Sequence, residues 1–179
     1  MDPGERAGEP PTPVKGPSLL DREPGVVSLF ALENITLIVW HAQPTERAVD
    51  RLRQTTERRR KQYPNGISVI HLVKGGIVLP DMPTREAFVR LMKSSNNALA
   101  CVAVIVGGTG FWASAARSLV TGLRVLARGE FDMRLHGDIS EVVKWLPEKH
   151  AARTGVSVDA AQLSGALQAI ESDHHALAS

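Results

Sequence analysis

Five short segments along the chain are dominated by apolar and β-branched residues, and four of them contain no charged residue. The first two, residues 26–32 (VVSLFAL) and 35–41 (ITLIVWH), are separated only by Glu33 and Asn34. This spacing predicts two antiparallel strands joined by a tight turn. We expect the other three segments to form strands as well: residues 67–73, 99–106 and 131–136.

Segments with helical spacing of apolar residues alternate with these strands. Thr45 is a candidate N-cap for a helix that ends at residues 63–66 (YPNG), where tyrosine, proline, asparagine and glycine follow one another. We expect Thr84 to cap a second helix after a long turn over residues 74–83. Its predicted inner face carries four apolar residues, Ala87, Phe88, Leu91 and Met92.

Three further helices are predicted in the second half of the chain. One covers residues 111–128, and another begins at Ser140. The last is capped by Ser157 or Asp159, and its apolar face is formed by residues three or four positions apart, Leu163, Leu167 and Ile170. Beyond it, the end of the chain (SDHHALAS) has the composition of a frayed tail.

The order of elements predicts an α/β fold. It reads ββαβαβαβα with an extra C-terminal helix, which favours a mostly parallel sheet with an N-terminal β-hairpin. Residues 1–24 are rich in proline and glycine and predict a disordered tail. We place the α/β domain at residues 25–150, and the C-terminal amphipathic helix with its tail at residues 151–179.

Composition narrows the class of protein. The chain has 179 residues, 43% of them hydrophobic, and a net charge of +2, which gives no general reason to expect nucleic acid as a partner. No apolar run approaches the roughly 20 residues needed to span a bilayer, and the acidic, proline-rich start is unlike a signal peptide. We therefore expect a cytoplasmic protein. Cys101, the single cysteine, lies in a predicted strand and is expected to be a buried apolar residue rather than a reactive thiol.

The turn from Gly107 to Ala113 allows two interpretations. Gly108, Thr109 and Gly110 begin a G-x-G-x-x-A pattern between a strand and a helix, and backbone amides at such a helix N-terminus can hold the phosphate of a nucleotide. In the other interpretation the glycines serve a tight strand-to-helix turn. That interpretation is favoured because the motif follows the fourth strand rather than the first, and because Phe111 and Trp112 crowd the mouth where a pyrophosphate would bind.

The same region carries a resemblance to a family. The hairpin and three βα units are followed by short matching segments: GFW at 110–112, RSL at 117–119, GL at 122–123, FDMRL at 131–135 and WL at 145–146. Over roughly residues 26–146 this pattern resembles the STAS domain, the sulfate-transporter and anti-sigma-factor-antagonist module, and in particular its stand-alone bacterial relatives. The resemblance implies a STAS-like sandwich, a small α/β fold. It also implies a non-catalytic regulatory or scaffolding module that binds a protein partner. In some relatives it implies phosphorylation control, or binding of a nucleotide or a lipid.

Residues 74–84 (KGGIVLPDMPT) correspond to the loop that is phosphorylated on serine in the antagonist branch. This chain lacks the Asp-Ser pair found there, and Thr84 is the only hydroxyl of the loop, so it is either a phosphorylation site or simply an N-cap. The apolar residues of the loop either cover the core or form a contact patch. We expect the partner surface to comprise seven residues of this loop and of the glycine turn: Ile77, Val78, Leu79, Asp81, Thr84, Phe111 and Trp112.

The remaining polar residues do not indicate an enzyme, a metal site or a cofactor. Six basic residues of the first helix form either a docking surface for an anionic partner or a solvated helix face: Arg51, Arg53, Arg58, Arg59, Arg60 and Lys61. No pair of histidines has the spacing of a helical zinc site with a third ligand, and no serine lies in a nucleophile elbow. Self-association through Phe111, Trp112 or the terminal helix is left open.

Overall fold

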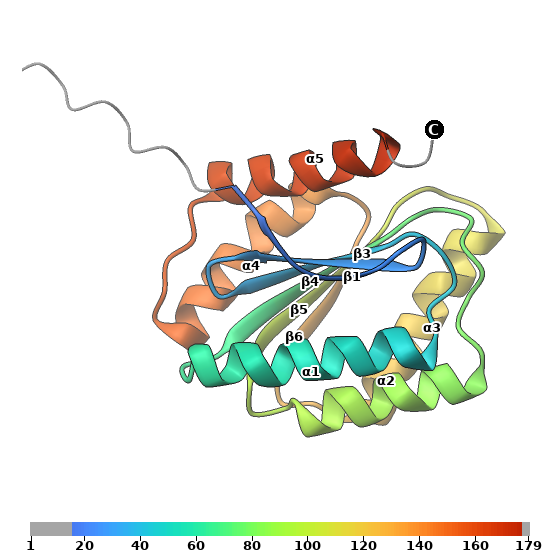
Figure 1. Cartoon of the computed structure of the whole chain (residues 1–179), viewed down its shortest axis with the longest axis horizontal. Helices are drawn as coiled ribbons and strands as arrows, with labels where there is room; N and C mark the ends of the chain where they lie inside the picture. Colours follow the sequence, from blue (N-terminus) through green and yellow to red (C-terminus); the bar gives the residue numbers. More distant parts are fainter. Residues whose placement is uncertain (1–15, 177–179) are drawn as a thin grey trace, which may run out of the picture.

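A twisted sheet of six strands forms the centre of the fold, in a computed structural model that describes residues 16–176 (Figure 1). The strands lie in their chain order: β1 (Ser18–Glu23), β2 (Val27–Leu32), β3 (Ile35–Trp40), β4 (Ile67–Val73), β5 (Leu99–Val106) and β6 (Asp132–His136). β1, β2 and β3 are antiparallel, and β3 to β6 are parallel. The predicted α/β class and N-terminal hairpin are confirmed.

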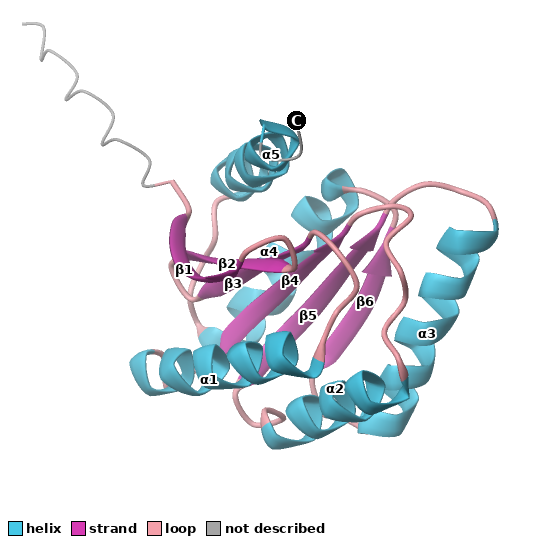
Figure 2. Cartoon of the chain, turned by 45° about the vertical axis from the view of Figure 1, so that its right-hand side comes forward, coloured by secondary structure: helices cyan, strands magenta, loops and turns pink. Residues whose placement is uncertain are grey.

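Helices cover both faces of the sheet (Figure 2). α1 (Glu46–Gln62), α2 (Met82–Ser94) and α3 (Phe111–Ala127) lie on one face. When parallel strands lie side by side in chain order and every crossover connection is right-handed, the crossover helices all lie on the same face of the sheet. α4 (Ile139–Thr154) and α5 (Ala160–Ala176) follow the last strand and pack on the other face.

The two faces have separate apolar cores because side chains alternate along each strand. In β3, Ile35, Leu37 and Val39 pack toward α4 and α5, whereas Ile38 and Trp40 pack toward α1 and its neighbours. All six residues of this strand are buried. A central strand buried on both faces has the continuous apolar sequence seen here rather than a simple alternation.

Two of the predicted helix caps are present. The Thr45 side chain accepts a hydrogen bond from the Ala48 amide at 3.1 Å, which caps α1. At the start of α5, the Asp159 carboxylate accepts from the Gln162 amide at 2.7 Å, so Asp159 rather than Ser157 is the cap.

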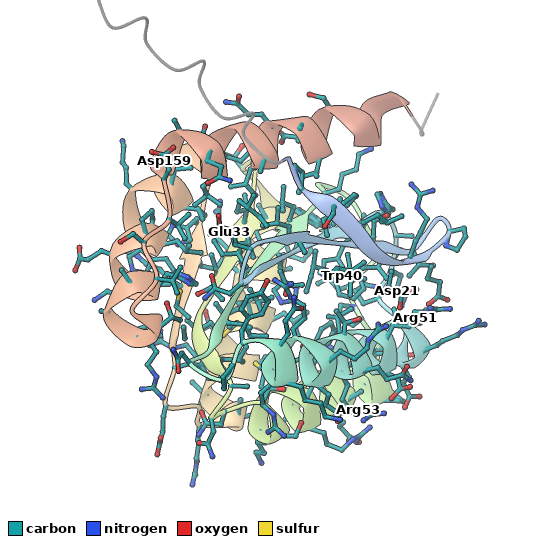
Figure 3. The ribbon with its side chains drawn as sticks, turned by 60° about the vertical axis from the view of Figure 1, so that its left-hand side comes forward. Asp21, Glu33, Trp40, Arg51, Arg53 and Asp159 are labelled. Carbon is teal, nitrogen blue, oxygen red and sulfur yellow. The ribbon has the colours of Figure 1, made fainter. Side chains whose placement is uncertain are left out.

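The expected disordered tail over residues 1–24 is wrong for its last part, whereas residues 1–15 lie outside the described residues. Ser18–Glu23 form β1, the edge strand paired with β2. Asp21 anchors it to the first helix, because Arg51 Nη1 lies 2.9 Å from Asp21 Oδ1 (Figure 3). Leu20 packs on the core. The pairing with β2 and the ion pair with Arg51 offset the low strand propensity of this segment. Its composition reveals neither interaction.

The boundary placed at residue 150 does not divide the structure either. α4 continues through it to Thr154, and the apolar residues of α5 belong to the same core as β3. Pro147 lies inside α4. The predicted terminal helix is therefore an integral layer of the domain.

Arg59 is another departure from expectation, because both interpretations of the basic residues of the first helix place its side chain at the surface. Its side chain is buried, and its guanidinium donates to the backbone carbonyls of Glu33 and Ile35 and lies 4.8 Å from the ring centre of Tyr63. Burial lowers the pKa of Arg59. A long side chain on the border of the buried face can reach the carbonyls of the β2–β3 turn, which helical periodicity alone does not show.

Candidate functional site

The loop between β4 and α2 faces both the core and the solvent. Ile77 and Leu79 are half-buried and pack on the core, whereas Val78 is exposed. The Trp112 indole N–H donates to the Ile77 carbonyl at 2.7 Å, which joins this loop to the start of α3. The structure therefore brings together the two segments that the sequence assigned to one surface. Ile77 and Leu79 cover the core, whereas the contact patch stays a prediction.

Phe111 and Trp112 have opposite roles although they are adjacent. Trp112 is half-buried and holds the loop, whereas the Phe111 side chain is 90% exposed. Every other aromatic residue within residues 16–176 is buried or half-buried. An exposed phenylalanine of this kind costs solvation free energy unless another surface covers it.

The N-cap predicted at Thr84 is wrong. Asp81 caps α2, and its carboxylate accepts from the Thr84 amide at 3.0 Å and from the Thr84 hydroxyl. These hydrogen bonds lower the pKa of Asp81. The helix begins three residues earlier than expected because Pro83 fits its first turn, where no backbone N–H is needed. Thr84 is only 2% exposed, so its hydroxyl faces the protein rather than the solvent.

A groove of about 830 Å³ runs between α2 and α3. On the α3 side it is lined by small residues, Ala115, Ser118 and Gly122, and ends at the exposed Leu126. Phe111 lies four residues before Ala115, so it stands on the same face of the helix. Phe111 and Leu126 are fifteen residues apart, so the face between them is about 22 Å long at 1.5 Å per residue.

The α2 side of this groove adds an exposed apolar residue and charge. Met82 is exposed at one end, and the wall carries Arg85, Arg90 and Lys93 against a single carboxylate, Glu86. Neither Met82 nor the groove-facing residues of α3, Ala115, Ser118 and Gly122, were expected from the sequence. The spacing of Phe111, Ala115, Ser118 and Gly122 by three or four residues was a signal for the α3 face alone.

Gly108, Thr109 and Gly110 form an exposed turn. Gly108 and Gly110 have φ angles of 83° and 91°, which side chains other than glycine rarely adopt. Arg117 Nη2 donates to the Gly108 carbonyl at 3.1 Å and to the Val106 carbonyl at 3.3 Å. Arg117 of α3 thus holds both the turn and the end of β5. This agrees with the interpretation in which the glycines serve a tight strand-to-helix turn.

A separate hollow of about 500 Å³ lies at the carboxyl ends of β3, β4 and β5, where open α/β sheets commonly bind ligands. Its lining includes two carboxylates, Asp138 and Glu171, and one cation, Lys74. Hydrogen bonds from Ser140 and from the Glu141 amide lower the pKa of Asp138, which keeps it negatively charged. This lining is unfavourable for a phosphate.

Ser68, His150 and Asn34 form a buried polar network. His150 Nδ1 lies 2.7 Å from Ser68 Oγ, and His150 Nε2 lies 3.0 Å from Asn34 Oδ1. Since Asn34 Oδ1 only accepts, Nε2 carries the proton and Nδ1 accepts from the Ser68 hydroxyl. Burial lowers the pKa of His150, in keeping with this neutral form. Ser68 and His150 have no exposed surface, so this trio holds α4 against the sheet and cannot reach a substrate.

Cys101 extends the network, with its Sγ 3.1 Å from Ser68 Oγ. It is fully buried, and burial raises the pKa of its thiol to about 11. The prediction of a buried apolar cysteine is confirmed.

The basic residues of α1 are partly neutralised. Arg51 pairs with Asp21, Arg53 pairs with Asp50 and Glu57 at 2.8 Å, and Arg59 is buried. Within residues 16–176, no three His, Cys, Asp or Glu side chains are grouped so that they could hold a metal ion. Over the same range, no helix has both the length and the apolar character required to cross a membrane.

Comparison of the chain with protein-family models and with curated proteins found no match.

Proposed function

We propose that this chain is a non-catalytic module that regulates or scaffolds a protein partner by binding it along the groove between α2 and α3. The observation that carries the proposal is Phe111, the one aromatic side chain of residues 16–176 that is largely exposed. It lies one helical turn before Ala115, which lines the groove. Aromatic residues supply a large share of the binding free energy at protein interfaces. The resemblance to the STAS domain supports the same class of function.

The side chains that line the groove determine which kind of partner segment can bind there. Small residues on α3 allow the backbone of another helix to approach closely, and Phe111, Met82 and Leu126 offer apolar contacts at the ends. The three cations against one carboxylate on the α2 wall favour a negatively charged segment. The partner therefore presents an amphipathic helix of about fifteen residues, which matches the groove in length, with an apolar stripe flanked by carboxylates.

Site-specific photo-crosslinking in the cells that make the protein tests this function. p-Benzoylphenylalanine replaces Phe111 or Ser118 in the groove, and replaces Ala152, an exposed residue of α4 on the opposite face, as the matched control. We expect one discrete adduct shared by positions 111 and 118 and absent at position 152. Mass spectrometry should place the linked peptide in an acidic, amphipathic helix of another protein.

Three outcomes contradict the proposal. The first is the absence of an adduct at both groove positions, and the second is an identical adduct at position 152. The third is a linked peptide from a second copy of this chain, which would make the groove a dimer interface instead.

A further inference from the structure

A partly enclosed hollow of about 120 Å³ lies between the sheet and helices α1 to α3, beneath the loop that joins β4 to α2. Val69, Val102 and Val104 of the sheet face Leu119 and Ala116 of α3 across it. Protein interiors are normally packed with few voids larger than a water molecule. Side chains as short as valine and alanine leave this space open where the two layers meet.

The lining of the hollow is largely apolar, and four of its side chains carry a polar group. None of its twenty-five residues is charged, and Thr56, Ser95 and His71 are its only polar side chains apart from the Trp40 indole. Trp40 lies between the sheet and α1, and its Nε1–H donates to His71 Nδ1 at 3.1 Å (Figure 3). An indole nitrogen only donates, so Nδ1 is the acceptor and the proton of the neutral ring is on Nε2.

The second nitrogen of His71 has no protein partner. Within residues 16–176, no hydrogen bond to Nε2 is formed, and the half-buried ring lines the apolar hollow. Burial lowers the pKa of His71 to about 4, so the ring is neutral near pH 7 and Nε2–H is an uncharged donor. A donor in such a place is satisfied only by water or by a ligand.

We propose that this hollow is a binding site for a small uncharged apolar molecule that has one hydrogen-bond acceptor, such as a carbonyl oxygen, which receives the Nε2–H of His71. A cavity of about 150 Å³ lined by similar side chains accommodates a benzene-sized molecule, so a site of this volume takes roughly six or seven heavy atoms. An ionised ligand is excluded because no charged residue lines the site.

This site does not rest on the proposed partner groove, although the two share a boundary. Ile77 and Leu79 line the hollow from above, and the indole of Trp112 holds this part of the loop by its bond to the Ile77 carbonyl. The ligand would enter by displacement of this loop and would contact its inner side. Crosslinking at Phe111 and ligand binding at His71 can therefore succeed or fail independently.

The test is a titration of the full isotope-labelled chain followed by NMR of methyl groups, with three probes of similar shape. Cyclohexanone has the acceptor, methylenecyclohexane lacks it, and cyclohexanecarboxylate carries a charge. We expect saturable one-to-one binding of the ketone with shifts centred on Val104 and Leu119. Methylenecyclohexane should bind about fivefold more weakly, the scale of one hydrogen bond, and the carboxylate should not bind.

Two variants locate the site. Ala116→Leu fills the hollow and should abolish binding of both neutral probes, whereas His71→Phe should keep methylenecyclohexane binding and lose the preference for the ketone. The proposal is overturned if neither neutral probe saturates, or if the carboxylate binds as well as the ketone. It is also overturned if either neutral probe still binds when the hollow is filled. Because the three-probe comparison uses the unaltered chain, it decides the question even if a variant does not fold.

Discussion

Replacing Ser68 by alanine isolates the contribution of the buried Ser68–His150–Asn34 network. The hydroxyl is fully buried and donates to His150 Nδ1 at 2.7 Å, while its oxygen lies 3.1 Å from Cys101 Sγ. The variant leaves Nδ1 without a donor in a site closed to water. Loss of one partner of a buried hydrogen bond costs about 1–3 kcal/mol, so we expect a decrease of about 2 kcal/mol in the free energy of unfolding.

Thr36→Val provides the matched comparison. Thr36 lies on β3, is also buried, and its hydroxyl has no hydrogen-bond partner. Valine has nearly the same shape and removes an unsatisfied polar atom, so its free energy of unfolding should stay the same or rise by about 1 kcal/mol. The two substitutions each remove one buried hydroxyl, and they differ in whether that hydroxyl is bonded.

Urea denaturation at pH 7.5 measures both variants against the original chain. Thermal unfolding gives an independent value, because a loss of about 2 kcal/mol lowers the Tm of a domain of this size by about 4–8 °C. If Ser68→Ala is no more destabilising than Thr36→Val, the network does not hold α4 to the sheet and the reasoning is refuted.

Three further predictions concern single residues. The pKa of His71 is about 4 in the folded chain against an ordinary 6.5, so the unfolded state binds a proton first as the pH falls. The free energy of unfolding therefore decreases below pH 6.5, by at most about 3 kcal/mol for this group. Urea titrations at pH 7 and pH 5 should show a smaller difference in the free energy of unfolding for His71→Gln than for the original chain. The buried thiol of Cys101 should react with a disulfide reagent at pH 8 only as fast as the chain opens, and rapid reaction of the native protein would be incompatible with the structure. Asp81→Ala should lower the Tm in thermal melts because the α2 cap is lost, while Asp81→Asn should keep a Tm close to that of the original chain.

Much of the fold could be predicted because five of the six strands have a strong local signal. Residues 99–106 are apolar throughout and are buried at every position, as a central parallel strand requires. β1 could not be predicted, since Ser18–Glu23 contains three charged residues and owes its place to pairing with β2 and to Arg51. Its stability comes from partners distant in the sequence.

The candidate site was predictable only in part, for a similar reason. The meeting of the β4–α2 loop with the start of α3 follows from the parallel topology, in which the carboxyl ends of neighbouring strands lie together. Which of the two adjacent aromatics is exposed depends on the bond from Trp112 to the Ile77 carbonyl, a contact between residues 35 positions apart. The groove and the hollow depend on the separation of packed helices and the sheet, which no local pattern encodes.

The most direct test of the central claim is the affinity of the chain for the helical segment found by crosslinking, measured by calorimetry. Phe111→Ala should weaken binding by about 30-fold, the effect of an interface residue worth about 2 kcal/mol, with no change in Tm because the side chain is exposed. Leu19→Ala, an exposed leucine on β1, should bind as tightly as the original chain. Equal affinities for all three proteins would contradict the account.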